Sequence, residues 1–130
     1  MQDSTRRQRG LDMISKVYGS QLPAGSITPP GQSRFIDYML ETLFSELWSC
    51  ETLSFKERRL LLLGVIAAQG EEEVFAIQAS AALDNGEITE EQLKEIVLFL
   101  TQYAGYPKAS KLHVRIGALL KARAEQTPPA

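Results

Sequence analysis

Glu46 is the residue in this sequence whose type and position best suit proton transfer. It interrupts an otherwise mostly apolar stripe at helical spacing within residues 35–47, and Trp48 lies two positions further on. Partial burial beside an indole disfavours the charged form of a carboxylate and so favours proton exchange. We therefore expect Glu46 to act as an acid/base group. The alternative is a charge at a helix end, solvated or paired with Arg58 or Arg59.

Two consecutive arginines, Arg58 and Arg59, begin a strongly apolar segment. A guanidinium group binds carboxylates through a fork of two hydrogen bonds, so one of them is a candidate for holding an anionic substrate. A structural ion pair with Glu46 or Glu57 is the other interpretation.

Four more side chains are candidates for substrate binding: Trp48, Gln78, Tyr103 and His113. Gln78 lies among small residues and can orient a carbonyl group or a water molecule, but an amide cannot act as a general base near pH 7. Trp48 is equally explained as a core residue, and the Tyr103 hydroxyl needs a partner if it is buried. His113 is alternatively a surface or interface histidine.

The single cysteine, Cys50, and the single histidine, His113, exclude several kinds of site. One cysteine rules out an internal disulfide, a Cys-x-x-Cys redox pair and a cysteine-based zinc site. One histidine rules out a metal site that needs two or three imidazoles from one chain. We therefore expect no metal site of these kinds within the chain.

The composition is that of an ordinary globular protein, with 44% hydrophobic and 23% charged residues in 130. This length predicts a single domain over 1–130, with fraying at 1–5 and 124–130. A net charge of −2 gives no field to attract nucleic acid. The longest apolar run, residues 60–68, is too short for the ~20 residues of a spanning helix. Residues 1–10 do not resemble a secretory signal, so we expect a cytoplasmic protein without membrane contact.

The hydrophobic periodicity is helical throughout, and no stretch alternates in the manner of a strand. Capping boxes at Ser54–Glu57 and Thr89–Gln92 mark two helix starts, and Asn85-Gly86 marks a helix end. The sequence thus predicts an all-α fold of about six helices. The first expected helix ends at Gly19, and the second is a long helix over 35–48. The third starts from the Ser54 box and ends at Gly70, and the fourth covers 71–83. The fifth starts at Thr89 and breaks at Gly105, and the last covers 108 to about 122. The helix at 55–69 is apolar all round and is expected to be central. Because the faces at 35–48 and 93–100 exceed what one small core can cover, we expect a homo-oligomer.

Three motifs in order resemble the carboxymuconolactone decarboxylase family, in particular its small stand-alone γ-carboxymuconolactone decarboxylase branch. They are SELWSCETLSFKERR (45–59), QASAALDNGEITEEQLKEIV (78–97) and YAGYPKA (103–109). Residues 6–19 also fit the opening helix of that family, so the resemblance covers roughly residues 6–118.

The resemblance implies an all-α domain that assembles as a trimer or hexamer, with sites near subunit contacts. It implies either cofactor-free decarboxylation of a lactone acid or thiol-based peroxide reduction. Glu46 matches a family glutamate, whereas the family histidine falls on Gln78. The two peroxidatic cysteines fall on Glu71 and Val74, so alkylhydroperoxidase or peroxiredoxin activity lacks its thiolates. Residues 111–120, KLHVRIGALL, imitate the histidine motif but follow YAGYP and belong to the last helix.

Together these features predict a cofactor-free enzyme for a small organic acid, lactone or enolisable carbonyl compound. Glu46 would carry the proton, an arginine would hold an anion, and Gln78 would position the substrate. The reaction would be decarboxylation, isomerisation or ring opening or closing. The rival prediction is an oligomeric binding or scaffold relative that lost its catalytic base.

Overall fold

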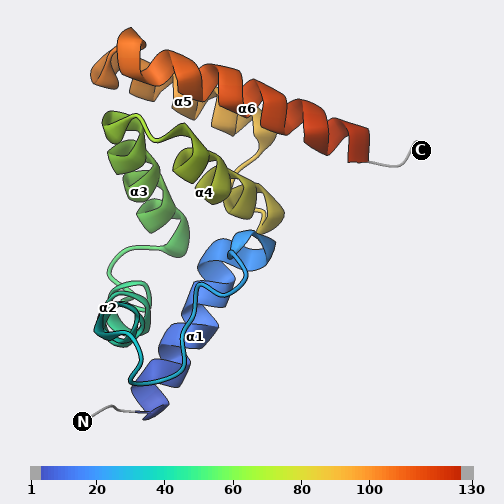
Figure 1. Cartoon of the computed structure of the whole chain (residues 1–130). Helices are drawn as coiled ribbons and strands as arrows, with labels where there is room; N and C mark the ends of the chain where they lie inside the picture. Colours follow the sequence, from blue (N-terminus) through green and yellow to red (C-terminus); the bar gives the residue numbers. More distant parts are fainter. Residues whose placement is uncertain (1–3, 127–130) are drawn as a thin grey trace. The chain divides into compact units, whose positions relative to one another are not determined.

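The fold is all-α, as predicted. The computed structural model describes residues 4–126, which form six α-helices, one 3₁₀ turn and one π-helix (Figure 1). In chain order these are α1 (Ser4–Tyr18), η1 (Gly19–Gln21), α2 (Arg34–Tyr38), the π-helix η2 (Met39–Leu47), α3 (Phe55–Gln69), α4 (Glu72–Asp84), α5 (Glu90–Ala104) and α6 (Tyr106–Gln126). Of the ends expected to fray, residues 4–5 and 124–126 belong to α1 and α6, and the others lie outside the described residues.

The chain divides into two compact units, one up to Arg58 and one from Arg59 onward. The boundary falls within the first turn of α3, so that helix belongs mainly to the second unit. A single domain over residues 1–130 stays a prediction.

The first unit is built on the packing of α1 against η2. Ile14 and Val17 of α1 and Leu40 and Phe44 of η2 are all at most 3% exposed and form its core. Gly10 is the point of closest approach, because a Cβ atom there would lie 2.0 Å from the Leu40 carbonyl oxygen. Only a glycine lets the two helices come this near.

The residues expected to form one apolar stripe along 35–47 face outward in the first unit. Phe35, Tyr38 and Leu47 are 78%, 57% and 60% exposed, whereas the buried hydrophobic residues are Leu40, Phe44 and Trp48. The physical reason is the π-helix, whose i→i+5 hydrogen bonds widen each turn and bring residues spaced by four onto one line.

The polar loop before α2 is held by a buried ion pair. Arg7 donates from Nε to Asp37 at 3.2 Å and from Nη2 to the Thr28 carbonyl at 2.6 Å. Asp37 also accepts the Gly31 amide at 3.0 Å. The charges of Arg7 and Asp37 thus compensate each other. Their bonds to Thr28 and Gly31 fix the Pro- and Gly-rich loop before α2 to α1.

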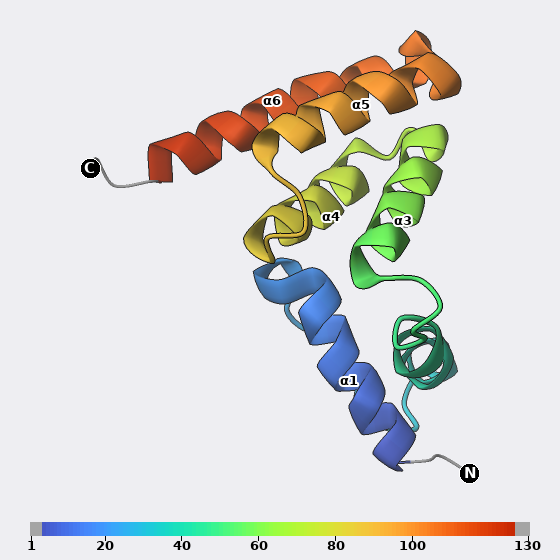
Figure 2. The same ribbon diagram turned by 180° about the vertical axis from the view of Figure 1, so that it is seen from behind.

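The second unit places α3–α6 around one core (Figures 1 and 2). Leu63, Phe75, Leu93 and Leu112, one from each helix, are at most 1% exposed. Helices α5 and α6 run antiparallel side by side in both views, joined at Gly105 with φ +97°. Val97 of α5 and Ile116 of α6, 5% and 3% exposed, face the same core.

Local signals for helix ends are also confirmed. The Ser54 amide donates to Glu57 at 2.7 Å and the Glu57 amide donates to Ser54 Oγ at 3.0 Å. Hydrogen bonds from the Ser54 backbone amide and from the Ser54 side chain to the Glu57 carboxylate hold the pKa of that carboxyl below its usual value. The Thr89–Gln92 box forms as well, and Gly70 and Gly86 take the positive φ angles that end α3 and α4.

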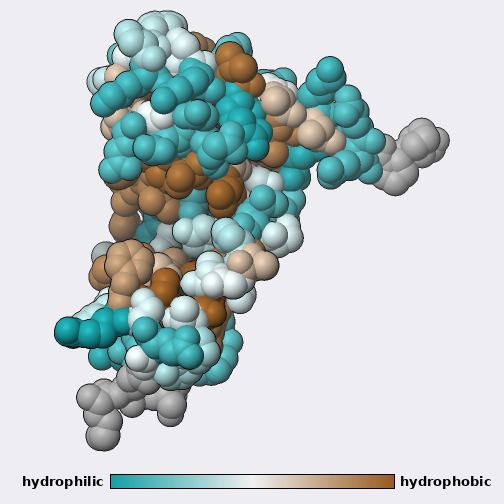
Figure 3. Space-filling view, in the orientation of Figure 1, coloured by the Kyte–Doolittle hydropathy of each residue, from teal (hydrophilic) through white to brown (hydrophobic). Residues whose placement is uncertain are grey.

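Hydrophobic side chains reach the surface in both units (Figure 3). On α3, Leu61 and Val65 are 61% and 55% exposed, so the prediction of a helix covered on every side is wrong for the chain by itself. The covered face of α3 contains Leu63, Ile66 and Ala67 and also the charged Arg59. No helix in the described part of the chain is both long and apolar enough to cross a bilayer.

We predict that Gly10→Ala destabilises the protein by about 1–3 kcal/mol, because the added methyl group overlaps the Leu40 backbone. Urea denaturation monitored by circular dichroism measures this loss. Gly117→Ala is the matched control, since a Cβ atom there meets nothing within 4 Å. It should stabilise α6 by up to about 1 kcal/mol. Equal effects of the two substitutions would contradict the proposed close approach.

Candidate functional site

Glu46 lies on η2, a π-helix of nine residues, which is unusual because π-helical turns are rare and frequently mark functional sites. Its side chain is 51% exposed and forms an ion pair with Arg6 of α1. The expectation of a partly dry carboxylate is therefore wrong for the chain by itself, because the stripe that carries Glu46 faces outward.

Trp48 is buried rather than open to a ligand. It is 7% exposed, and its ring centroid lies 5.0 Å from that of Phe55. Lys16 of α1 lies over the other aromatic partner, 4.6 Å from the Phe55 centroid. These contacts agree with the core interpretation of Trp48.

Arg59, Gln78 and Glu87 form a buried polar cluster in the second unit, here named the Arg59 cluster. Arg59 is fully buried and donates from Nε and Nη2 to the two carboxylate oxygens of Glu87, at 2.9 and 3.0 Å. Its Nη1 donates to the side-chain oxygen of Gln78, which is 2% exposed. The Asn85 side-chain Nδ2 also donates to Glu87 Oε2 at 3.0 Å. One guanidinium thus links α3, α4 and the turn that follows α4.

The structure brings together Arg59 and Gln78, as a shared substrate-binding role would require, but it encloses both. The fork of Arg59 is occupied by Glu87, so the partner is neither Glu46 nor Glu57, the two acids considered from sequence. The side-chain oxygen of Gln78 is held by Arg59 instead of reaching into a cleft. Sequence reasoning missed Glu87; its position directly after the Asn85-Gly86 stop is a local signal for a chain reversal, but not for a partner on α3.

Arg58 differs from its neighbour because it stays near the surface. It donates to the Leu53 carbonyl at 2.6 Å, which helps to close the turn before α3. Its guanidinium remains accessible to an anion, so Arg58 keeps the substrate-binding role as a prediction.

Cys50 is exposed in the turn between η2 and α3. A hydrogen bond with the Thr52 side chain, at 3.4 Å, and one with the Thr52 backbone lower the pKa of its thiol.

Tyr103 is 82% exposed on α5, and its ring packs at 5.3 Å from that of Phe99. The hydroxyl group is therefore exposed to water and needs no hydrogen-bond partner within the protein.

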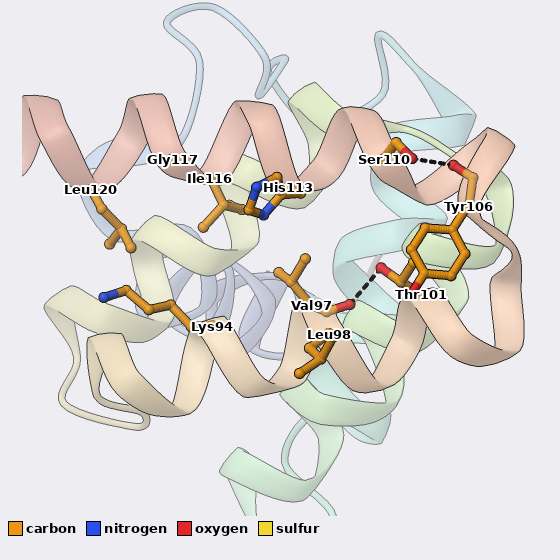
Figure 4. Close-up of a pocket in the computed structure, with 10 residues that line it drawn as sticks. All are labelled: Lys94, Val97, Leu98, Thr101, Tyr106, Ser110, His113, Ile116, Gly117 and Leu120. Carbon is orange, nitrogen blue, oxygen red and sulfur yellow. Dashed lines mark hydrogen bonds between the residues drawn. The ribbon is translucent and has the colours of Figure 1, made fainter.

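His113 lines an open pocket in the groove between α5 and α6, with a volume of about 580 Å³ (Figure 4). His113 therefore borders a pocket, which the alternative interpretation of a surface histidine does not predict. The residues that line the pocket are Lys94, Val97, Leu98, Thr101, Tyr106, Ser110, His113, Ile116, Gly117 and Leu120. The surface they offer is mainly apolar, with a few polar groups, which is the usual character of small-molecule sites.

The chemistry in this fold is therefore of three kinds. An accessible carboxylate–guanidinium pair, Glu46 with Arg6, lies in the first unit. A closed and fully paired cluster around Arg59 lies in the second unit. An open apolar pocket beside the imidazole of His113 also lies in the second unit.

Comparison with known proteins assigns the class. The model of the family described as "Carboxymuconolactone decarboxylase family" matches residues 34–113, and the chain belongs to that family. The match includes Glu46, Arg59, Gln78 and His113.

Two characterised relatives are decarboxylases. The chain is 28% identical over 112 residues to 4-carboxymuconolactone decarboxylase of Acinetobacter baylyi, covering 85% of this chain and 83% of the relative. It is 29% identical over 104 residues to nitrosuccinic acid decarboxylase of Metarhizium robertsii, covering 75% and 69%. No solved structure gives a significant match.

We predict that Glu87→Ala destabilises the protein by about 3–5 kcal/mol, because it leaves the Arg59 guanidinium buried without its carboxylate. Thermal and urea unfolding measure the change. Glu73→Ala is the matched control, since it breaks the exposed pair with Arg115 and should have little effect. A loss of similar size in both variants would mean that the Arg59 cluster does not hold the helices together.

Proposed function

We propose that this protein is a cofactor-free enzyme that decarboxylates a small organic acid by acid/base catalysis. The observation that carries the proposal is membership of the carboxymuconolactone decarboxylase family together with two relatives named as decarboxylases. Their names specify a carboxylated lactone and a nitro dicarboxylic acid, so the substrate class we infer is a small acid whose carbanion is stabilised by a neighbouring carbonyl or nitro group.

Glu46 is the proposed proton carrier. When the carboxylate of the substrate leaves as CO₂, the electrons of the broken C–C bond remain on the substrate carbon, which must then receive a proton. Glu46 is accessible enough to take a proton from water and return it to that carbon. Exposure also lets it reach a substrate without a conformational change.

Arg6 and Arg58 are the proposed anion-binding groups of the same unit. Arg6 already pairs with Glu46, and a substrate carboxylate competes for the same guanidinium. Arg58 offers a second accessible guanidinium at the start of α3. Gln78, the position that the family resemblance aligns with a histidine, is proposed to support the fold through Arg59 rather than to contact substrate.

We predict that Glu46→Gln lowers kcat for CO₂ release by about 100-fold or more, because the amide keeps the shape of the side chain but cannot give or take a proton near pH 7. The wild-type protein is first screened with γ-lactone acids, β-keto acids and nitrosuccinate by CO₂ release. Glu46→Asp should retain part of the activity. Glu51→Gln, a neighbouring exposed glutamate, is the control and should retain all of it. Full turnover by Glu46→Gln would remove Glu46 from the mechanism.

A non-catalytic binding or scaffold protein is the second candidate. The enclosure of Gln78 within the Arg59 cluster favours it, because an amide that is already bonded contributes no proton transfer. Failure of wild-type protein to release CO₂ from every acid in the screen, while it remains folded, would favour this candidate over the enzyme.

Homo-oligomer formation as a trimer or hexamer is part of the proposal. The outward stripe of Phe35, Tyr38 and Leu47 leaves a large apolar surface in contact with water. Light scattering after gel filtration should give a mass that is three or six times 14.4 kDa. Leu47→Glu should lower that mass by introducing a charge into the stripe. A 14.4 kDa species in the wild type would contradict assembly.

A further inference from the structure

The pocket between α5 and α6 has the size and lining of a ligand site. Its volume of about 580 Å³ lies within the ~300–1,000 Å³ that small-molecule sites occupy. Val97, Leu98 and Ile116 supply much of its apolar wall (Figure 4). Glu46, the proposed catalyst, belongs to the other unit, so binding in this pocket is a separate question from turnover.

The polar groups of the pocket are arranged along its length. Lys94 of α5 and Tyr106 of α6 lie toward opposite ends, and His113 projects from α6 between them (Figure 4). The Thr101 and Ser110 hydroxyls donate to carbonyls of their own helices, at 2.7 and 2.6 Å. Their hydrogens are therefore already used.

Lys94 and Tyr106 retain donors for a ligand. The Lys94 ammonium contacts Glu91 at 3.2 Å, but the two side chains are 59% and 86% exposed, so this pair is weak and easily exchanged. The Tyr106 hydroxyl accepts a bond from Gln102 at 2.9 Å, and its own hydrogen can still be donated. No carboxylate is among the residues that line the pocket. The site thus combines a cation at one end, a hydroxyl donor at the other and apolar walls between.

We propose that this pocket binds an elongated organic anion with a carboxylate at one end, an apolar body and a hydrogen-bond acceptor at the other end. The carboxylate pairs with Lys94, the acceptor receives the Tyr106 hydroxyl, and the body lies against Val97, Ile116 and the ring of His113. The inference concerns binding alone and does not depend on the proposed decarboxylation.

The test uses 3-(4-hydroxyphenyl)propanoate as the probe, because it carries a carboxylate and a phenolic oxygen on either side of a ring. Binding to the full chain is followed by calorimetry and by amide shifts in NMR, which should change first in α5 and α6. The uncharged amide of the same acid should bind at least about tenfold more weakly, because a charge-assisted hydrogen bond is lost. Equal affinity for acid and amide, or no binding of the acid, would overturn the proposal.

Lys94→Gln should weaken binding of the acid by about tenfold and leave binding of the amide unchanged. Lys121→Gln, on the exposed surface of α6 and outside the pocket, is the matched control and should change neither. The difference between acid and amide separates loss of the ion pair from general damage to the fold. An unchanged affinity in Lys94→Gln would contradict the assigned carboxylate position.

Gly117→Leu tests the position of the apolar body. A Cβ atom at Gly117 meets nothing within 4 Å, and leucine favours the helix, so the variant should fold and fill the pocket. Binding of the acid should then fall by at least about tenfold, whereas Gly117→Ala should retain most of it. If Gly117→Leu instead lowers the mass of an oligomer and leaves probe binding unchanged, the pocket is a contact between copies of the chain and the proposal is wrong.

Discussion

The buried guanidinium of Arg59 imposes the strongest constraint on the second unit. Removing an arginine from water costs several kcal/mol, and only a carboxylate with well-placed hydrogen bonds compensates for it. Glu87 supplies both carboxylate oxygens and Gln78 a third acceptor. These partners come from α4 and the turn after it. Hydrogen bonding of Arg59 to both of them therefore fixes the position of α3 relative to α4. The core of the unit packs around that position.

The polar side chains of this fold are therefore of two kinds, those that are buried and paired and those that are accessible. The Arg59 cluster is closed, so its groups stabilise the fold and are not offered to a substrate. The accessible groups lie elsewhere: the carboxylate of Glu46 beside Arg6 in one unit, and the pocket beside His113 in the other. Two relatives are named as decarboxylases of small acids, and the proposed function assigns the proton carrier and the anion site to the accessible groups of the first unit.

Much of the local structure could be read from the sequence, because it depends on neighbours in the chain. The capping boxes at Ser54 and Thr89 form as predicted, since each involves residues only three positions apart. Gly86 ends α4 because few other residues adopt its positive φ angle. The inward face of α5, with Leu93 and Val97, follows from the 3.6-residue period of an ordinary α-helix.

The sequence by itself therefore determined the all-α class and the helix ends that capping boxes and glycines mark. Only the tertiary structure decided which side chains are exposed. In η2 the π-helical turn changed the spacing, so Leu40 and Phe44 became buried and Glu46 faced outward. Of two adjacent arginines, Arg59 was buried because Glu87, 28 positions away, was brought to it by the fold. Such choices depend on contacts between distant segments, and no pattern of neighbouring residues records them.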